Sequence, residues 1–393
     1  MEEAGVLLCR YGELFLKSGN RRRFERVLAD NIRAAVSDLR DAKVSTTHGR
    51  TLVRVQRNDL DDAAGRLERV FGLVSFSVAR KVDAAPDLEA IGAAAVDETR
   101  AALARDRPAS FKVESRRADK RFPVTSLEIS RRVGGRIHDE IGLAVDVHTP
   151  ALTVGIEVAA GGGAFVYGGT RAAPGGLPVG ASGRALLLLS GGIDSPVAGW
   201  LAAKRGLALD AVYFHSPPYV GEKSRDKVLT LARKLARWQA VRSVTVVPFT
   251  DVQKRLRAAG PGELAVVLYR RMMMRIADAV ADQLGADGLV TGENLGQVAS
   301  QTIHNLATIE NAARRVVLRP LLTYDKVETT GLAQRIGTYD TSILPFDDCC
   351  SLFVPAHPAT RTRVEDVAPA EAKLDLAAEV AAAVAASERV AIP

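Results

Sequence analysis

The 393-residue chain contains few cysteines and lacks any long apolar run. It has three cysteines, two of them adjacent, which excludes a disulfide framework and is typical of a reducing cytoplasm. No run of about twenty apolar residues occurs, which argues against a membrane-spanning helix. The acidic start at Met1, Glu2 and Glu3 leads straight into a strand pattern and lacks the features of a signal peptide. We therefore expect a cytoplasmic globular protein.

Basic residues are plentiful and unevenly distributed, with a formal net charge of +7. This charge favours a polyanionic partner such as nucleic acid. Three clusters precede residue 140, and any one of them is also explained as a solvated face. Their co-occurrence in one half of the chain favours an RNA- or DNA-binding surface. The clusters are Arg21, Arg22, Arg23 and Arg26; Arg116, Arg117, Lys120 and Arg121; and Arg131, Arg132 and Arg136.

Segment 186–197 reads as a buried strand, a glycine-rich turn and the start of a helix. Gly191 and Gly192 allow a tight turn, and the N-terminus of a helix favours an anion. No lysine occurs in the turn, so it is not a Walker A loop. Ser-Gly-Gly-x-Asp-Ser after an apolar strand instead resembles the PP-loop of the ATP pyrophosphatases, which adenylate a carbonyl oxygen and release pyrophosphate. The residues expected to hold phosphate are Ser190, Gly191, Gly192, Asp194 and Ser195.

Glycine and proline accumulate over 169–183, which predicts an interdomain linker. Before it, strands and helices in mixed order favour a small α+β unit of ferredoxin-like type, followed by a second α+β unit. After it, apolar strands alternate with helices, which predicts a doubly wound parallel sheet and a ligand at the carboxyl ends of its strands. The expected strands are 185–189, 211–214, 244–247, 288–291 and 316–318, and the expected helices are 196–205, 223–239, 263–284, 302–313 and, at the end, 370–386.

Several residues at these strand ends suit a nucleotide. Tyr213 and Phe214 end the second strand and are suited to packing a base, and the guanidinium of Arg270 is suited to a phosphate. Segment 292–301 places polar residues at the mouth of a loop, although a helix-capping turn explains it equally. Met272 to Met274 are better explained as core than as a functional surface.

Asp347-Asp348-Cys349-Cys350 is the second chemical feature. A metal site is poorly supported, because the chain has no Cys-x-x-Cys and Cys9 is the only other thiol. A disulfide between adjacent cysteines requires a strained ring. Two buried cysteines are one interpretation. A reactive thiolate beside an adenylating crevice is the other, and the two aspartates would not lower its pKa.

Together these stretches resemble the tRNA 4-thiouridine synthetases, also called tRNA sulfurtransferases. The resemblance implies a ferredoxin-like domain over 1–80, a THUMP RNA-binding domain over 81–168, a linker over 169–183 and a PP-loop catalytic domain over 184–393. It is carried, in family order, by 10–17 (RYGELFLK), 117–123 (RADKRFP), the turn at 190–195, 214–218 (FHSPP), 270–275 (RRMMMR), 291–293 (TGE), 296–301 (GQVASQ), 336–340 (IGTYD) and 348–350 (DCC).

The implied reaction uses ATP to adenylate O4 of the uridine at position 8 of tRNA, after which sulfur carried as a persulfide displaces AMP. Asp194 would act in the turn with Mg²⁺. Cys349 matches the family's functional thiol, and Cys350, which stands where some members have glycine, ranks second. The resemblance places nucleotide contacts on Leu188, Leu189, Tyr213, Phe214, Arg270, Gly292 and Gln301.

Longer family members append a rhodanese domain with a second sulfur-carrying cysteine, and no such domain is expected here. Sulfur would then come from a cysteine desulfurase or another persulfide donor. The family can also thiolate the small sulfur-carrier protein of thiazole synthesis in the thiamine pathway, and it suggests a homodimer. Two alternatives remain open: an adenylating enzyme acting only on a protein carboxylate or other non-RNA substrate, and a nonenzymatic tRNA-binding protein, against which the intact turn argues.

Overall fold

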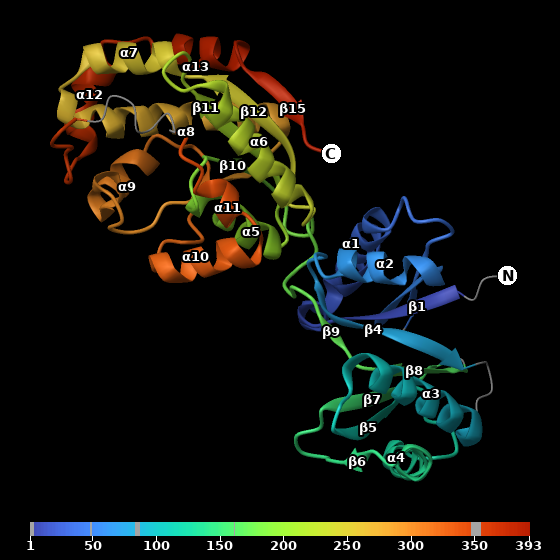
Figure 1. Cartoon of the computed structure of the whole chain (residues 1–393). Coiled ribbons are helices and arrows are strands. Elements are labelled where there is room, and N and C mark those ends of the chain that lie inside the picture. Colours follow the sequence, from blue (N-terminus) through green and yellow to red (C-terminus); the bar gives the residue numbers. More distant parts are fainter. Residues whose placement is uncertain (1–3, 48, 83–86, 161, 347–354) are drawn as a thin grey trace. The chain divides into compact units, whose positions relative to one another are not determined.

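The computed structural model describes residues 4–47, 49–82, 87–160, 162–346 and 355–393. The chain divides into two compact units, unit 1 (Met1–Pro178) and unit 2 (Val179–Pro393), which are described separately (Figure 1). In the described ranges, no helix combines the length and the apolar character needed to cross a membrane.

The first half of unit 1 is an antiparallel sheet with the strand order β2-β3-β1-β4. The two central strands, β3 and β1, are buried at most positions, and Phe24, Leu28 and Ile32 of α1 are also buried. The elements are β1 (Ala4–Tyr11), the 3₁₀ helix η1 (Glu13–Asn20), α1 (Arg21–Ala35), β2 (Lys43–Thr47), β3 (Arg50–Gln56), the 3₁₀ helix η2 (Arg57–Asp59), α2 (Leu60–Leu67) and β4 (Leu73–Val82).

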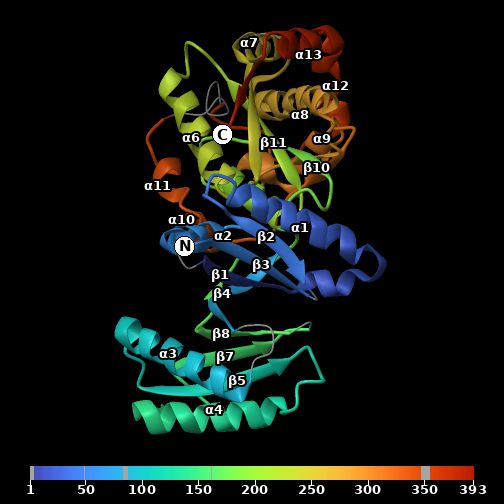
Figure 2. The same cartoon turned by 90° about the vertical axis from the view of Figure 1, so that its right-hand side faces the viewer.

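The second half of unit 1 continues the same sheet from β4 through β8, β7 and β5 to β6. The helices α3 and α4 pack side by side on these strands (Figure 2). The short strand that begins at Ala144 ends at Val145, because the Asp146 carboxylate accepts the backbone N–H groups of His148 and Thr149 and forms a turn. The elements are α3 (Leu88–Asp106), β5 (Ser110–Arg117), α4 (Ser126–Ile141), β6 (Ala144–Val145), β7 (Leu152–Val158), β8 (Ala164–Gly168) and β9 (Arg171–Ala172), which pairs with β4.

Unit 2 contains the predicted doubly wound sheet, with the order β14-β13-β10-β11-β12-β15. The first five strands in this order are parallel. The chain adds β11 and β12 on one side of β10 and then β13 and β14 on the other, so β10 and β13 flank the point where the strand order reverses. The strands are β10 (Arg184–Leu188), β11 (Ala208–His215), β12 (Val241–Pro248), β13 (Gly288–Val290), β14 (Val316–Leu318) and β15 (Glu388–Ala391).

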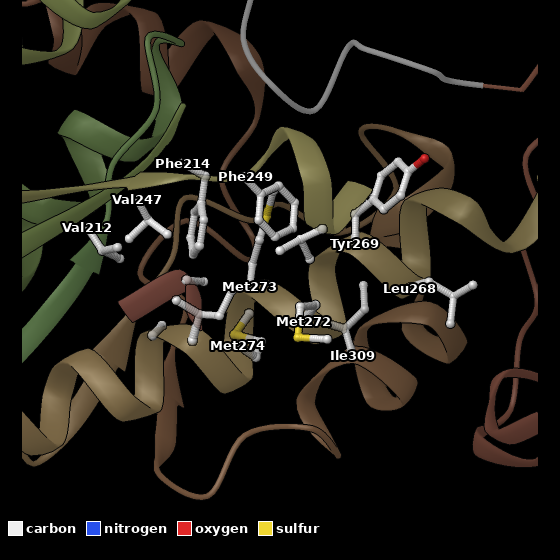
Figure 3. Close-up of a cluster of buried hydrophobic side chains, with 14 of the residues drawn as sticks. Val212, Phe214, Val247, Phe249, Leu268, Tyr269, Met272, Met273, Met274 and Ile309 are labelled. Carbon is white, nitrogen blue, oxygen red and sulfur yellow. The ribbon is translucent and has the colours of Figure 1, made fainter. Parts of the chain in front are cut away.

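Helices cover both faces of this sheet, with α5 and α6 on one face and α8 on the other (Figure 1). Met272, Met273 and Met274 of α8 are buried among Phe214, Phe249 and other apolar side chains, as predicted for core residues (Figure 3). The helices are α5 (Asp194–Lys204), α6 (Glu222–Ala236), α7 (Thr250–Ala259), η3 (Gly262–Leu264), α8 (Ala265–Leu284), η4 (Ala299–Gln301), α9 (Ile303–Glu310), α10 (Lys326–Arg335), α11 (Tyr339–Ser342), α12 (Val364–Glu371) and α13 (Leu376–Ala385).

The end of the chain differs from the prediction of one helix over 370–386. A turn after α12 separates it from α13, whose N-terminus is capped by the Asp375 carboxylate, which accepts from the backbone N–H of Ala378. The last residues form β15, antiparallel to β12, which the sequence analysis did not predict. Arg389 of β15 donates to Ser243 of β12 at 3.1 Å, and this side-chain contact supplements the backbone pairing.

Candidate functional site

The carboxyl ends of β10, β11 and β13 open onto a cavity of about 490 Å³ in unit 2. This is the position that the strand order predicts for a ligand. Gly191 belongs to the turn at its edge but is not among the residues that line it. Of the residues expected to contact a nucleotide, the cavity brings together Leu188, Leu189, Ser190, Gly192, Asp194, Ser195, Tyr213, Phe214, Arg270, Gly292 and Gln301.

The turn after β10 is held by two serines. The Ser195 hydroxyl accepts the backbone N–H of Ser190 at 2.8 Å and lies 3.0 Å from the Ser190 hydroxyl. The Ser190 hydroxyl in turn accepts the backbone N–H of Gly192 at 3.2 Å. Ser195 is buried in the first turn of α5, so these contacts fix the turn directly at the N-terminus of a helix. This arrangement suits a phosphate group.

Gly292 has a steric reason to be glycine. A Cβ atom there would lie 2.6 Å from the backbone nitrogen of Ser195 and 2.7 Å from its Cα. The loop after β13 therefore passes against the phosphate turn at a distance that no other residue permits without displacing the backbone. Gly292 therefore allows the loop after β13 and the turn after β10, which both line the cavity, to lie in contact.

Asp194 has partners that the sequence analysis did not predict. Its carboxylate pairs with Nζ of Lys326, at 2.8 Å, and accepts from the Gln297 side-chain amide at 2.9 Å. Lys326 is the first residue of α10, whose N-terminus has a capping box formed by Asp325 and Glu328. The cap thus places a lysine beside the turn even though the turn itself contains none. Lysines follow helix N-caps in many sequences, so this position alone could not have predicted that Lys326 pairs with Asp194.

A second group of charges lies behind the cavity wall. Glu293, which is 1 % exposed, accepts from Nε of Arg319 at 2.8 Å and lies 3.4 Å from Nη1 of Arg270. Burial raises the pKa of the Glu293 carboxyl, but the charges of Arg270 and Arg319 outweigh it and bring the pKa below its ordinary value. The carboxylate is therefore ionised at neutral pH.

The aromatic side of the cavity is fixed by stacking. The Tyr213 ring stacks on His215 with a centroid distance of 5.8 Å, and Phe214 packs edge-to-face on Phe249 at 5.1 Å. Across the cavity, the side-chain oxygen of Gln301 is buried and has no hydrogen-bond partner in the described part of the chain. An acceptor of this kind suits a ligand N–H group.

The thiols of Cys349 and Cys350, with Asp347 and Asp348, lie outside the described residues. Cys9 lies in β1 and is fully buried, and burial raises the pKa of its thiol to about 12. Cys9 is therefore an unreactive residue of the core. Within the described ranges, no group of three or more histidine, cysteine, aspartate or glutamate side chains is arranged to hold a metal ion.

All three basic clusters lie on unit 1. The first, over 21–26, is in α1, and the other two lie at the end of β5, in the following loop and on α4. Arg121, Arg131 and Arg132 are exposed and pair with the nearby carboxylates of Asp119 and Glu128. Arg116 pairs with Glu114 at 3.2 Å. Arg117 is half-buried and donates to the Phe122 carbonyl at 2.6 Å.

Models of three protein domains match successive parts of the chain. They are the ferredoxin-like domain of ThiI over residues 6–77, the THUMP domain over 85–166 and the thiamine biosynthesis protein (ThiI) over 180–376. Two relatives named "Probable tRNA sulfurtransferase" are similar over nearly their whole length. The relative from Caldanaerobacter subterraneus is 45 % identical, and the match covers 94 % of this chain and 95 % of the relative. The relative from Moorella thermoacetica is 47 % identical, and the match covers 94 % of this chain and 93 % of the relative.

A solved structure, described as a 4-thiouridine synthetase–RNA complex with bound ATP, matches the whole of both chains with a TM-score of 0.91 and 36 % identity. The strand order and the turn define unit 2 as a PP-loop ATP pyrophosphatase domain, preceded by ferredoxin-like and THUMP domains. The chain belongs to the ThiI family, since a relative 45 % identical is covered almost completely.

Proposed function

We propose that this chain is an ATP-dependent tRNA sulfurtransferase that converts the uridine at position 8 of tRNA into 4-thiouridine. The observation that carries the proposal is the cavity of unit 2, where the serine-braced turn, Arg270 and the Tyr213–Phe214 pair surround one space. The names of the relatives and the RNA- and ATP-bound solved structure favour the same reaction.

In this proposal the phosphates of ATP lie on turn 190–195, where backbone N–H groups and the N-terminus of α5 attract negative charge. Arg270 binds a phosphate, and Lys326 lies beside the same turn. Asp194 fits Mg²⁺, since this ion is commonly held by one or two carboxylates together with substrate phosphates and water. When bound there, the ion would neutralise charge on the phosphates.

The chemistry follows from the poor reactivity of a neutral uracil carbonyl. Transfer of AMP to O4, with release of pyrophosphate, converts that oxygen into a good leaving group. The terminal sulfur of a persulfide then bonds to C4 while the C4–O4 bond breaks and AMP departs. A second thiol next attacks the carrier sulfur and forms a disulfide with it, so the S–S bond breaks and the transferred sulfur stays on C4. We assign the sulfur-handling role to Cys349 and, second, to Cys350.

The partners proposed for this reaction are tRNA, held by Arg116, Arg117, Lys120, Arg121, Arg131 and Arg132 of unit 1, and a cysteine desulfurase or another persulfide donor. We further propose a cytoplasmic homodimer. The description of the matching family model, a thiamine biosynthesis protein, favours a second substrate, the small sulfur-carrier protein of thiazole synthesis. Its carboxylate would be adenylated in the same cavity.

The test is nucleoside mass spectrometry on unmodified tRNA incubated with ATP, a cysteine desulfurase and cysteine. Wild type and Cys349→Ala are compared side by side. We expect 4-thiouridine from the wild type alone. Product from both proteins would move sulfur transfer to Cys350 or to free sulfide. No product from the wild type would contradict the proposed function and leave the carrier protein as substrate.

A further inference from the structure

We propose that Glu293 is a positioning residue for the nucleotide, whose buried carboxylate holds the Arg270 guanidinium in place at the wall of the cavity. The inference rests on the proposed function, in which Arg270 binds a phosphate of ATP. Arg270 lines the cavity and Glu293 does not, so Glu293 acts through Arg270.

Glu293 is itself held firmly. It follows directly on the loop in which Gly292 touches the phosphate turn, and its side chain is 1 % exposed. Its Oε2 accepts from the Thr291 hydroxyl at 3.0 Å and from Nε of Arg319 at 2.8 Å. One carboxylate oxygen therefore anchors the side chain to the ends of two neighbouring strands, β13 and β14.

The other carboxylate oxygen faces Arg270. Oε1 lies 3.4 Å from Nη1 of Arg270, and it makes no hydrogen bond to another described residue. The same Nη1 donates to the Ser300 hydroxyl at 3.3 Å. Arg270 has a long side chain that loses considerable rotamer freedom when it is fixed. An ion pair with Glu293 and a hydrogen bond to Ser300, both made by one nitrogen atom, restrict it before ligand binds and leave other N–H groups available.

The neighbouring ion pairs leave the negative charge of Glu293 to be balanced by Arg270. Arg319, its second cationic neighbour, also donates from Nη1 to Glu310 at 2.6 Å. The chain of ion pairs Arg270–Glu293–Arg319–Glu310 thus contains equal numbers of cations and anions. Because Glu310 compensates Arg319, the negative charge of Glu293 is balanced by Arg270. An apolar side chain would fill the same space without the cost of burying a charge. Packing therefore does not explain why a carboxylate is buried here and faces an arginine of the cavity.

The experiment measures the affinity of the full chain for ATP, without tRNA or sulfur donor, by isothermal titration calorimetry. Glu293→Gln keeps the shape of the side chain but removes its charge, and Arg270→Met removes the guanidinium. If Glu293 acts through Arg270, each single variant raises the Kd of ATP about tenfold and the double variant binds no more than about twofold more weakly than Arg270→Met, because the two changes remove one shared interaction.

Glu310→Gln is the matched control, since it removes a carboxylate from the same chain of ion pairs without touching Arg270. The Kd of this variant for ATP should stay within about twofold of the wild-type value, because Glu310 and Arg270 make no direct contact. Should Glu293→Gln fail to fold, Thr291→Val, which removes one hydrogen bond that anchors Glu293, should weaken ATP binding in the same direction and by less.

Wild-type ATP affinity in Glu293→Gln would overturn the proposal, and so would losses that simply add in the double variant. A wild type that binds ATP with the expected coupling but never thiolates tRNA would contradict the proposed function and leave the positioning role of Glu293 intact. A wild type that does not bind ATP would overturn both.

Discussion

The arginines around the cavity and most of those on the proposed RNA surface are held in opposite ways. Around the cavity, Arg319 is 9 % exposed and Arg270 is 22 % exposed, and both lie against a fully buried carboxylate. On unit 1, Arg121 and Arg131 are 85 % and 78 % exposed and pair with carboxylates at the surface. The same residue type is thus fixed in one region and exchangeable in the other.

The difference corresponds to two kinds of ligand. A small nucleotide is recognised by groups fixed in one geometry before it arrives. A polyanion is bound mainly through the release of counterions, and exposed arginines can exchange a neighbouring carboxylate for a phosphate at little cost. We expect changes at the cavity to abolish chemistry, and changes on unit 1 to alter affinity gradually and in a salt-dependent manner.

The largest expected effect comes from Asp194→Ala. Loss of the carboxylate removes the group proposed to hold Mg²⁺ and leaves Lys326 unpaired, so kcat for pyrophosphate release should fall by about 10³-fold, as when one electrostatic group of an active site is removed. The affinity for tRNA should not change, because the basic surface is in unit 1. Asp251→Ala, at an exposed carboxylate of the same unit, is the control. An equal loss of tRNA affinity would refute the separation of the two regions.

Gly292→Ala tests the close approach between two sides of the cavity. The added Cβ would contact the Ser195 backbone and force the loop and the turn apart, so kcat/KM for ATP should fall by about 10²-fold, the scale of a 1 Å misplacement. Gly331→Ala is a suitable control, because a Cβ at that position of α10 meets nothing within 4 Å. Equal activity of the two variants in the pyrophosphate assay would show that the approach is not required.

Glu157→Gln tests buried charge in unit 1, away from the exposed surface. Glu157 pairs with Arg10 at 3.0 Å and with Arg50 at 2.9 Å, and its loss leaves two poorly exposed arginines unpaired, at a cost of about 3 kcal/mol. Burial raises the pKa of Glu157, but Arg50 and Arg10 outweigh it and lower the pKa. Its stabilisation is therefore present above pH 4.5, its ordinary pKa, and is lost as the pH falls further.

Hydrogen exchange of β7 as a function of pH measures this effect, and the acid dependence should flatten in Glu157→Gln. Both tryptophans, Trp200 and Trp238, lie in unit 2, so tryptophan fluorescence reports unit 2 separately and should not change. Glu140→Gln, at an exposed carboxylate of unit 1, should cost less than about 1 kcal/mol. If the two variants were equally stable, the buried ion pairs would contribute nothing beyond surface pairs.

Sequence analysis predicted the parts of the molecule that depend on neighbouring residues. The apolar runs of the parallel strands and the turn at 190–195 each carry a local signal. The structure confirms the sheet and places the turn at the edge of the cavity. Contacts between distant segments have no such signal. Lys326 reaches Asp194 across 132 positions, and Arg319 reaches Glu293 across 26. β15 pairs with β12 only because the chain returns to that edge of the sheet.

The smallest effect is expected on the exposed surface. Lys120→Gln and Arg131→Gln each remove one cation proposed to contact tRNA phosphate, so each should weaken tRNA binding a fewfold and reduce the slope of log K against log salt by about 1. Arg40→Gln, at an exposed arginine of unit 1 beside Asp41, makes the same charge change outside this surface and should leave the slope unaltered. An equal change in all three variants would mean that tRNA senses only the net charge of unit 1. A change confined to Lys120→Gln and Arg131→Gln would locate phosphate contacts on the loop after β5 and on α4. It would also separate the exchangeable cations of this surface from the fixed ones of the cavity.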